Sequence, residues 1–507
     1  FGDYASDNQI IKADITFADY AEDSMDPESA GSGVASIEYK SVKVTQNGFN
    51  EADIKNEALS ETGYQTIEDI SAGHAEVVLG EGTKEDIEEG NYILFVRAAD
   101  NVGNGCIYVS TGAVYDYTVP SVKIVRDEQP TSVNGTLPVY DKDIKVTVYA
   151  NDFVQNSEDF ESSSDTASGV KSIAVTVTST DAKGNVKETK ESWTTELGDT
   201  PSLAELLEEN KSLSEKGFSF SVDSTEHNSN NIKVTAVVTD RAGKVVTKDS
   251  EYMAIDTTAP EVSYTYDNNS AQNGVYYKAD RTASVTVKER NFVNDLGHLY
   301  IAVKEKNQTE YSRYTYADLQ KGYLPGVSVS NYHDGQADYD VTAYDDNRTI
   351  TFDLTFSGDN EYDWYCYVED TNGKSAQTEP DFFVLDKTAP VLKNGGVKYY
   401  VDGKDVTAQV ENGSLFTSKE VKAVVSIDET NFAAEVSGFA DGQMAVNLTA
   451  ADNEGNNVDV TEKFIDAMTS ADSWSNSDEK NGLTREMSMT FGDDANYQFG
   501  FTYTDLA

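Results

Sequence analysis

Asp256-Thr257-Thr258-Ala259-Pro260 is one of three copies of the pentad Asp-x-Thr-x-Pro in this chain of 507 residues. The other copies are Asp116-Tyr117-Thr118-Val119-Pro120 and Asp386-Lys387-Thr388-Ala389-Pro390. Proline fixes φ, lacks an N–H group and pushes the preceding residue toward extended conformations, so each pentad is expected to be a stiff, non-helical joint. Because the pentads recur at intervals of domain length, the sequence predicts an array of similar modules rather than one large enzyme.

A second repeated element, a strand followed by Asp-x-x-Gly, lies upstream of each pentad. In every copy the residues 8, 6, 4 and 2 positions before the aspartate are apolar or aromatic, a period that places them on one face of a half-buried strand. The aspartate can accept hydrogen bonds from N–H groups of a turn and the glycine can adopt a positive φ, so a hairpin is predicted. The copies lie at 92–103, 232–243 and 362–373, and a fourth at 497–505 reaches its aspartate, Asp505.

Further period-two strands precede this element and also begin the modules. They are predicted at 15–17, 75–79, 144–148, 218–222, 283–287, 350–356, 423–427 and 487–491. Three short segments instead have helical spacing, at 200–207, 316–319 and 461–465, and we expect them to be insertions between the middle strands of the modules. In the first of these, Pro201 is predicted at the first helical position.

These motifs resemble the tandem immunoglobulin-like repeats of cell-surface and adhesin proteins of Gram-positive bacteria. The resemblance rests on the pentads, on Ala99-Asp100-Asn101-Val102-Gly103-Asn104 with its counterparts, and on the strands between them. It implies an all-β fold, a tandem array of four Ig-like β-sandwich domains with short helical insertions. The expected domains, called modules 1 to 4 below, are 1–118, 119–257, 258–387 and 388–507. We expect modules 1 and 4 to be truncated and the chain to be a fragment of a longer protein.

Composition narrows the classes of function. The chain has 89 acidic and 39 basic residues and a formal net charge of −50, which argues against nucleic acid and anionic membranes as partners. Cys106 and Cys366 fall in different modules, so a disulfide within one domain is not expected. The four histidines are scattered, and no nucleophile–base or phosphate-binding motif occurs, so the sequence predicts a protein that is not an enzyme.

Calcium is the candidate cofactor, because it binds six to eight oxygen ligands and acidic loops supply them. The candidate ligands are the aspartates of the turns and of the pentads: Asp100, Asp116, Asp240, Asp256, Asp370 and Asp386, with Asp505 as the last turn aspartate. A cation at the joints would stiffen the array. The alternative is that turn aspartates only accept hydrogen bonds from their own backbone and pentad aspartates only cap the linker.

Partner binding is predicted for a tyrosine-rich stretch of module 3. Tyrosines on loops give a large, rigid contact area at a small entropic cost, although tyrosine is also common in strands. The candidate ligand-binding residues are Tyr311, Tyr314, Tyr316, Tyr323, Tyr332, Tyr339, Tyr344 and, in module 4, Trp474. Trp474 lies in a polar segment and is either a plug over the sandwich edge or an exposed contact.

The sequence therefore favours a non-catalytic segment of a bacterial cell-surface or secreted protein, an adhesin or stalk that binds or projects toward a host protein or glycan. Two alternatives stay open: an immunoglobulin-binding, superantigen-like surface protein, and the accessory region of a large secreted glycan-acting hydrolase. In each case we expect an extracellular, monomeric, extended array without membrane contact in this fragment.

Overall fold

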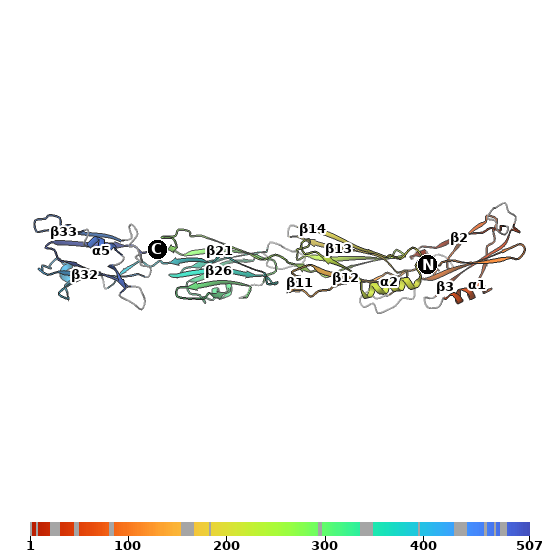
Figure 1. The fold of residues 1–507 in the computed structure, drawn as a ribbon, viewed down its shortest axis with the longest axis horizontal. Coiled ribbons are helices and arrows are strands. Elements are labelled where there is room, and N and C mark those ends of the chain that lie inside the picture. Colours follow the sequence, from red (N-terminus) through yellow and green to blue (C-terminus); the bar gives the residue numbers. More distant parts are fainter. Residues whose placement is uncertain are drawn as a thin grey trace. The chain divides into compact units, whose positions relative to one another are not determined.

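The computed structural model describes residues 3–6, 9–20, 31–44, 50–80, 86–153, 167–181, 184–292, 297–334, 348–393, 396–429, 444–460, 464–470, 473–476 and 484–507. These residues form two compact units, one from 1–258 and one from 259–507. Most elements of each unit are β-strands, with a few short helices (Figure 1). The predicted all-β class is therefore confirmed.

In residues 1–118 of the first unit, one sheet has the strand order β1-β8-β6-β3-β4, with β7 paired to β6, and β2 pairs with β5. Helix α1 (Glu51–Leu59) lies between β3 and β4 in the sequence. The strands are β1 (Asp3–Ala5), β2 (Lys12–Thr16), β3 (Val34–Val44), β4 (Gln65–Thr66), β5 (His74–Val78), β6 (Gly90–Asp100), β7 (Gly105–Val109) and β8 (Ala113–Tyr115).

Residues 119–257 of the same unit contain the sheets β15-β12-β9, β14-β13-β16-β17 and β10-β11-β18. Helix α2 (Leu203–Glu215) packs against β12 (Figure 1). The strands are β9 (Ser121–Arg126), β10 (Ser132–Asn134), β11 (Leu137–Tyr140), β12 (Ile144–Asn151), β13 (Val170–Thr180), β14 (Val186–Thr194), β15 (Phe218–Val222), β16 (Ile232–Asp240), β17 (Val245–Asp249) and β18 (Ala254–Ile255).

In the second unit, residues 259–387 form the sheets β19-β21-β25-β24 and β20-β28-β26-β22-β23, with β27 paired to β26. Helix α3 (Tyr316–Gln320) contacts β23 and β24. The strands are β19 (Glu261–Tyr266), β20 (Tyr276–Tyr277), β21 (Arg281–Lys288), β22 (Leu299–Glu305), β23 (Ser312–Tyr314), β24 (Val327–Asp334), β25 (Thr349–Phe356), β26 (Asn360–Glu369), β27 (Ser375–Gln377) and β28 (Asp381–Leu385).

Residues 388–507 of the second unit form the sheet β31-β30-β32-β35-β34, with β29 paired to β32, and the pair β33–β36. Two helices, α4 (Thr407–Glu411) and α5 (Asp466–Thr469), belong to this part of the chain. The strands are β29 (Val391–Leu392), β30 (Lys398–Val401), β31 (Lys404–Asp405), β32 (Val421–Asp428), β33 (Met444–Ala451), β34 (Ser475–Asn476), β35 (Thr484–Phe491) and β36 (Asn496–Tyr503).

The hydrophobic cores follow the predicted period of two. Alternate residues of β16, from Ile232 to Val238, are fully buried, and so are Tyr362, Trp364, Cys366 and Val368 of β26. Among the described residues, each strand pairs only with strands of the same predicted module. The division into four modules stays a prediction.

The helices correct one detail of the sequence prediction. Ser202 is the N-cap of α2 and forms a capping box with Glu205, so Pro201 precedes the cap instead of occupying the first helical position. Thr315 caps α3 in the same way, with Asp318. The third predicted helical segment begins outside the described residues, and α5 follows it. None of the helices in the described part of the chain is long and apolar enough to span a membrane.

The Asp-x-x-Gly turns are hairpins, as predicted. Gly103, Gly243 and Gly373 have φ values of +95°, +85° and +83°, the left-handed region that favours glycine. In the same turns, the N–H groups of Asp100, Asp240 and Asp370 donate to the carbonyl four residues later. Each hairpin thus places its aspartate at the end of a long central strand.

Candidate metal centre

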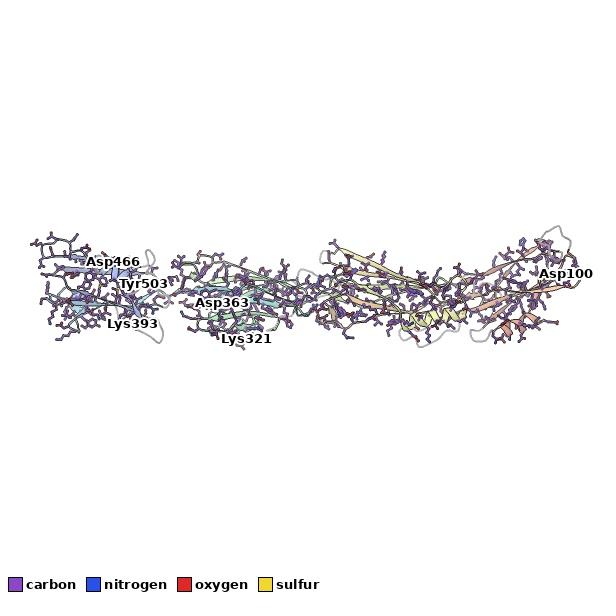
Figure 2. The ribbon with its side chains drawn as sticks, in the orientation of Figure 1. Asp100, Lys321, Asp363, Lys393, Asp466 and Tyr503 are labelled. Atoms are coloured by element: carbon purple, nitrogen blue, oxygen red, sulfur yellow. The ribbon has the colours of Figure 1, made fainter. Side chains whose placement is uncertain are left out.

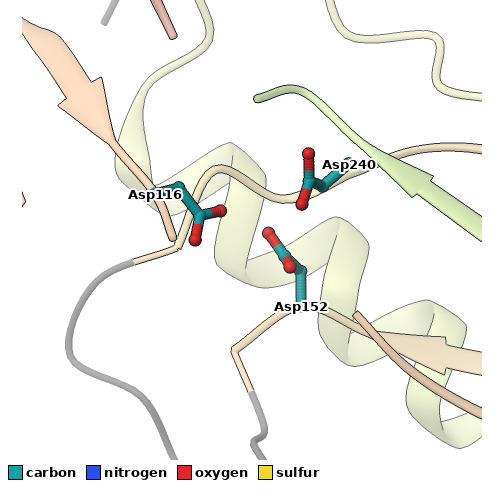
Figure 3. Close-up of side chains that lie close together, drawn as sticks. All are labelled: Asp116, Asp152 and Asp240. Carbon is teal, nitrogen blue, oxygen red and sulfur yellow. The ribbon is translucent and has the colours of Figure 1, made fainter. Parts of the chain in front are cut away.

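Three buried aspartates from three different elements converge in the first unit (Figure 3). Asp116 follows β8, Asp152 follows β12 and Asp240 is the last residue of β16. One carboxylate oxygen of each lies within 4.8 Å of the others. The three residues are 0%, 1% and 0% exposed, so the cluster is shielded from solvent.

Backbone N–H groups fix the orientation of each carboxylate. In Asp116, Oδ1 accepts from the N–H and hydroxyl of Thr118 (3.1 and 2.9 Å), and Oδ2 accepts from the Ser168 N–H at 2.7 Å. In Asp152, Oδ2 accepts from the Gly169 N–H at 2.5 Å. In Asp240, Oδ1 accepts from the Lys244 N–H at 2.8 Å. The threonine of the pentad therefore holds the pentad aspartate, and the Ser-Gly pair before β13 holds two carboxylates together.

Two oxygens of this cluster, Oδ1 of Asp152 and Oδ2 of Asp240, are buried and accept no hydrogen bond from the described residues. An unsatisfied buried carboxylate oxygen is costly, and a buried charge without a partner costs several kcal/mol, by rough estimate. The ion pairs of the described residues include none of the three aspartates. The donor set is thus all oxygen, anionic and already desolvated, which is the chemistry that a hard divalent cation requires.

The electrostatics of the cluster agree with this geometry. Burial, followed by the charges of Asp116 and Asp240, raises the pKa of Asp152 well above 3.8. Burial and the Asp116 charge raise the pKa of Asp240 from 3.8 to about 7. In both cases the ionised form lacks solvation and meets like charges. A bound cation would supply the missing compensation.

The pentad aspartate meets the hairpin of the following module rather than the hairpin that precedes it in the sequence. Strand β8 pairs with the beginning of β6, where Tyr115 lies opposite Gly90. Asp100 is at the other end of β6, and a strand rises about 3.3 Å per residue, so the two ends are roughly 30 Å apart. Figure 2 shows Asp100 at one end of the first unit.

Asp100 does not join a group of three acidic side chains within the described part of the chain. Its Oδ1 accepts from the N–H groups of Val102 and Asn104, and its Oδ2 accepts from the Asn104 side chain. Asp100 therefore accepts hydrogen bonds from its own turn, as a turn aspartate does.

A second cluster of the same kind lies in the second unit. Carboxylate oxygens of Asp386, Glu429 and Asp505 lie within 4.8 Å of one another. Asp386 and Glu429 are 4% and 5% exposed, and Asp505 is half-buried. Oδ1 of Asp386 accepts from the Thr388 N–H at 3.1 Å. Burial and the Asp386 charge raise the pKa of Asp505. This cluster combines a pentad aspartate, an acidic residue after β32 and a residue after β36, as in the first unit.

Module 3 contributes an equivalent pair of acidic residues. Glu289 follows β21, Asp370 follows β26, both are buried, and their carboxylate oxygens lie within 4.8 Å of each other. Asp370 Oδ1 accepts from the N–H groups of Asn372 and Lys374. The pentad aspartate Asp256 belongs to the first unit, where it is buried and its Oδ1 accepts from the Thr258 N–H and hydroxyl.

Sequence reasoning missed Asp152, Glu289 and Glu429. A signal was present, because each follows a period-two strand near the start of its module and lies one or three residues before a phenylalanine, at 153, 292 or 432. Module 1 has a related residue: Oδ2 of Asp19 accepts from the Gly33 N–H at 2.7 Å, as Asp152 accepts from Gly169. Gly33 and Gly169 have nearly identical φ values, +87° and +88°.

The candidate ligand-binding tyrosines lie in several environments. Tyr314 and Tyr316 pack against the core of module 3, and Tyr316 contacts Tyr332 and Phe352 with ring centroids 4.9 and 5.7 Å away. Tyr323 and Tyr332 are exposed. Tyr311 packs on Tyr365 at the outer face of the sheet. Tyr339 and Tyr344 lie outside the described residues.

Trp474 is 9% exposed and belongs to the core cluster of module 4. Its indole N–H donates to the Met468 carbonyl at 3.0 Å. The side chain is therefore buried in the core and is not an exposed contact.

Comparison with known proteins gives only distant likenesses. No family model matches the chain, and no curated protein matches it. A tetra-tandem repeat from the extending region of a large adhesion protein is 13% identical, with a TM-score of 0.29 over 93% of this chain and 83% of that one. A structure from a 1.5-MDa bacterial ice-binding adhesin is 10% identical, with a TM-score of 0.25 over 70% of this chain and 90% of that one.

The fibronectin domains FN1–FN3 of chicken CNTN1 are also similar, at 10% identity and a TM-score of 0.16 over 70% of this chain and 89% of that one. All three TM-scores are below 0.5, so these likenesses assign no function to the chain.

Proposed function

We propose that this chain is a non-catalytic segment of an extracellular bacterial surface protein, an adhesin or stalk that projects toward a host glycan or protein. The observation that carries the proposal is the buried carboxylate joint of the first unit. Asp116, at the end of one sandwich, is bound by Ser168 of the next and lies against Asp152 and Asp240. A protein that projects needs joints that resist bending between its domains.

We further propose that each of the two clusters of three carboxylates binds a calcium ion. Asp116, Asp152 and Asp240 supply the ligands in the first unit, and Asp386, Glu429 and Asp505 supply them in the second. Glu289 and Asp370 provide an acidic pair of the same kind. Calcium tolerates irregular geometry and higher coordination numbers, whereas magnesium demands a near-ideal octahedron, so clusters of carboxylates from separate strands suit calcium.

Small-angle X-ray scattering of the whole chain tests this function, with and without calcium after removal of metal by EDTA. Calcium should narrow the distribution of the overall dimensions of the chain in solution, because joints that hold a cation bend less. Asp152→Asn should weaken this response, whereas Asp100→Asn, at an exposed turn, should leave it intact. An unchanged scattering profile and an unchanged melting temperature on adding calcium would refute the metal-bound joint.

Adhesion needs a separate experiment. The chain, immobilised on beads, should retain ligands from a mucin preparation or from serum. Retention of mucin glycans would favour the glycan-directed adhesin, and retention of immunoglobulin would favour the superantigen-like alternative. If neither is retained, the projecting role would stand without the adhesive one.

A further inference from the structure

The outer face of the β22–β26 sheet in module 3 carries a group of aromatic rings, Tyr300, Tyr311, Tyr365 and Tyr367, which we call the tyrosine face. Tyr300 stacks on Tyr367 with ring centroids 4.7 Å apart, and Tyr311 meets Tyr365 edge-on at 5.0 Å. Tyr311, Tyr365 and Tyr367 are half-buried. Asp363 of the same strand marks this part of the second unit in Figure 2.

The fold does not require tyrosine at these positions. Relative to the hairpin aspartate of each module, Tyr365 and Tyr367 correspond to Thr235 and Val237 of module 2. Tyr300, opposite Tyr367, corresponds to Ala174, opposite Val237. Module 2 therefore forms the same strand pair with small side chains. The rings of module 3 need an explanation other than strand formation.

Module 1 covers the same outer face with a helix. Phe95, which corresponds to Tyr365, is fully buried and clusters with Ala58 and Ile54 of α1. In module 3, the helix of the described residues, α3, instead contacts β23 and β24. Tyrosine replaces phenylalanine where the helix is missing from the face. An aromatic ring with a polar hydroxyl suits a surface that meets water and a polar ligand.

The charges around the tyrosine face are largely paired. Lys304 pairs with Asp363 and Lys306 with Glu361, each at 2.7 Å, and the Tyr367 hydroxyl donates to Glu369 at 2.6 Å. Arg313 is exposed, lies 4.5 Å over the Tyr300 ring and forms no ion pair with a described residue. The face thus offers half-buried rings, donors and acceptors, and the charges described here are paired except for the Arg313 guanidinium. These features fit an uncharged polyhydroxylated ligand better than a charged one or an apolar protein anchor.

We propose that the tyrosine face binds a neutral glycan. The exposed parts of Tyr311 and Tyr365 contact the C–H face of a sugar ring, and Arg313 donates hydrogen bonds to its hydroxyl groups. The proposal rests on the adhesive part of the proposed function and names the ligand class for it.

An array of neutral, sialylated and sulfated glycans, incubated with the labelled 507-residue chain, tests the proposal. Neutral glycans should bind, and the double variant Tyr365→Ala, Arg313→Ala should bind them at least about tenfold more weakly, because the main contacts of a site carry most of its binding energy. Thr235→Ala, the equivalent position of module 2, should bind as the parent does. Far-UV circular dichroism and melting temperature show whether each variant is folded.

Binding only to charged glycans, binding to none, or equal binding by the parent and the double variant would overturn the proposal. If the double variant does not fold, Tyr311→Phe with Arg313→Gln keeps the rings and removes polar contacts, and neutral glycan binding should still fall. The calcium response of the joints is independent of this face. If the parent chain shows no calcium response, the metal-bound joint is contradicted. If it shows the calcium response but binds no neutral glycan, only the glycan proposal is contradicted.

Discussion

Ser168 donates its backbone N–H to Oδ2 of Asp116 at 2.7 Å, across 52 positions of sequence. The same serine donates its hydroxyl to Oδ2 of Asp152 at 3.4 Å and accepts a hydrogen bond from the Ala242 N–H at 3.2 Å. One residue therefore connects the pentad of one module with the loop and the hairpin of the next. The three aspartates are held close together by the backbone even though their charges repel.

Asp152→Asn should change the stability of the first unit differently with and without calcium. Without metal at pH 7.5, the variant should be at least as stable as the parent, because it removes a buried charge that lies near two others. With calcium the parent should gain about 2.7 kcal/mol when the ion is at a hundred times its dissociation constant, and the variant should gain much less. Calorimetry in EDTA and in calcium measures both, with Asp100→Asn as the control. Equal gains in the parent and in Asp152→Asn would contradict the assignment.

The stability of the metal-free first unit should fall as the pH rises from about 4 to 7. The pKa of Asp240 is raised to about 7 in the folded chain, so in this interval the folded state holds a proton that the unfolded state has released. The free energy of unfolding then decreases with pH through this interval, and the contribution of Asp240 is on the order of a few kcal/mol. Urea unfolding in EDTA at several pH values measures the slope. Asp240→Asn should flatten it, and a slope of opposite sign would refute the assignment.

Gly169→Ala should destabilise the first unit more than Gly184→Ala. Both glycines have positive φ, +88° and +78°. A Cβ at Gly169 would lie 2.9 Å from Leu206 Cδ2, whereas one at Gly184 meets nothing within 4 Å. We expect a loss of roughly 2–3 kcal/mol at Gly169 and about 1 kcal/mol at Gly184. Because the Gly169 N–H holds Asp152, only the first variant should also lose calcium affinity, as isothermal titration can show.

Thr118→Val should weaken calcium binding, whereas Thr388→Val should leave it nearly unchanged. The Thr118 hydroxyl donates to Asp116, but the Thr388 hydroxyl donates to Asp359 instead of to Asp386. Residues that orient metal ligands affect affinity by roughly tenfold or more when removed. Terbium luminescence titration of the two variants tests this difference. Equal losses in both would mean that the hydroxyl does not position the ligand.

Much of the fold could be predicted from the sequence. Period-two apolar residues such as Ile232 to Val238 can only be buried together on one face of a strand, and Gly243 has the positive φ that its turn demands. Two of the three aspartates of the first cluster, Asp116 and Asp240, could also be predicted, because pentad and turn aspartates recur. The turn alternative was correct for one oxygen of Asp240, which accepts from its own hairpin, while the other oxygen faces the cluster.

Which aspartates meet could not be predicted, because this depends on which end of a strand each one occupies. Asp100 is nearer to Asp116 in sequence, but β6 separates them by its whole length. Asp152 was overlooked because it belongs to no repeated pentad or hairpin. Its position depends on Gly169, which only tertiary structure brings to it. The face occupied by Tyr311 was equally undetermined until the register of β22, β23 and β26 was known.

The hydrogen bond between Ser168 and Asp116 has a mechanical consequence. When the chain is pulled from its ends, tension passes from β8 through Thr118 and Pro120 into β9, along covalent bonds. The hydrogen bonds of the Asp116 side chain are not part of this covalent path, so they carry little of the tensile load. These hydrogen bonds instead resist bending, because tilting one sandwich relative to the next would stretch them. Under flow, the strands and the covalent backbone would therefore resist tension. A few carboxylates and their hydrogen bonds would resist bending between the modules.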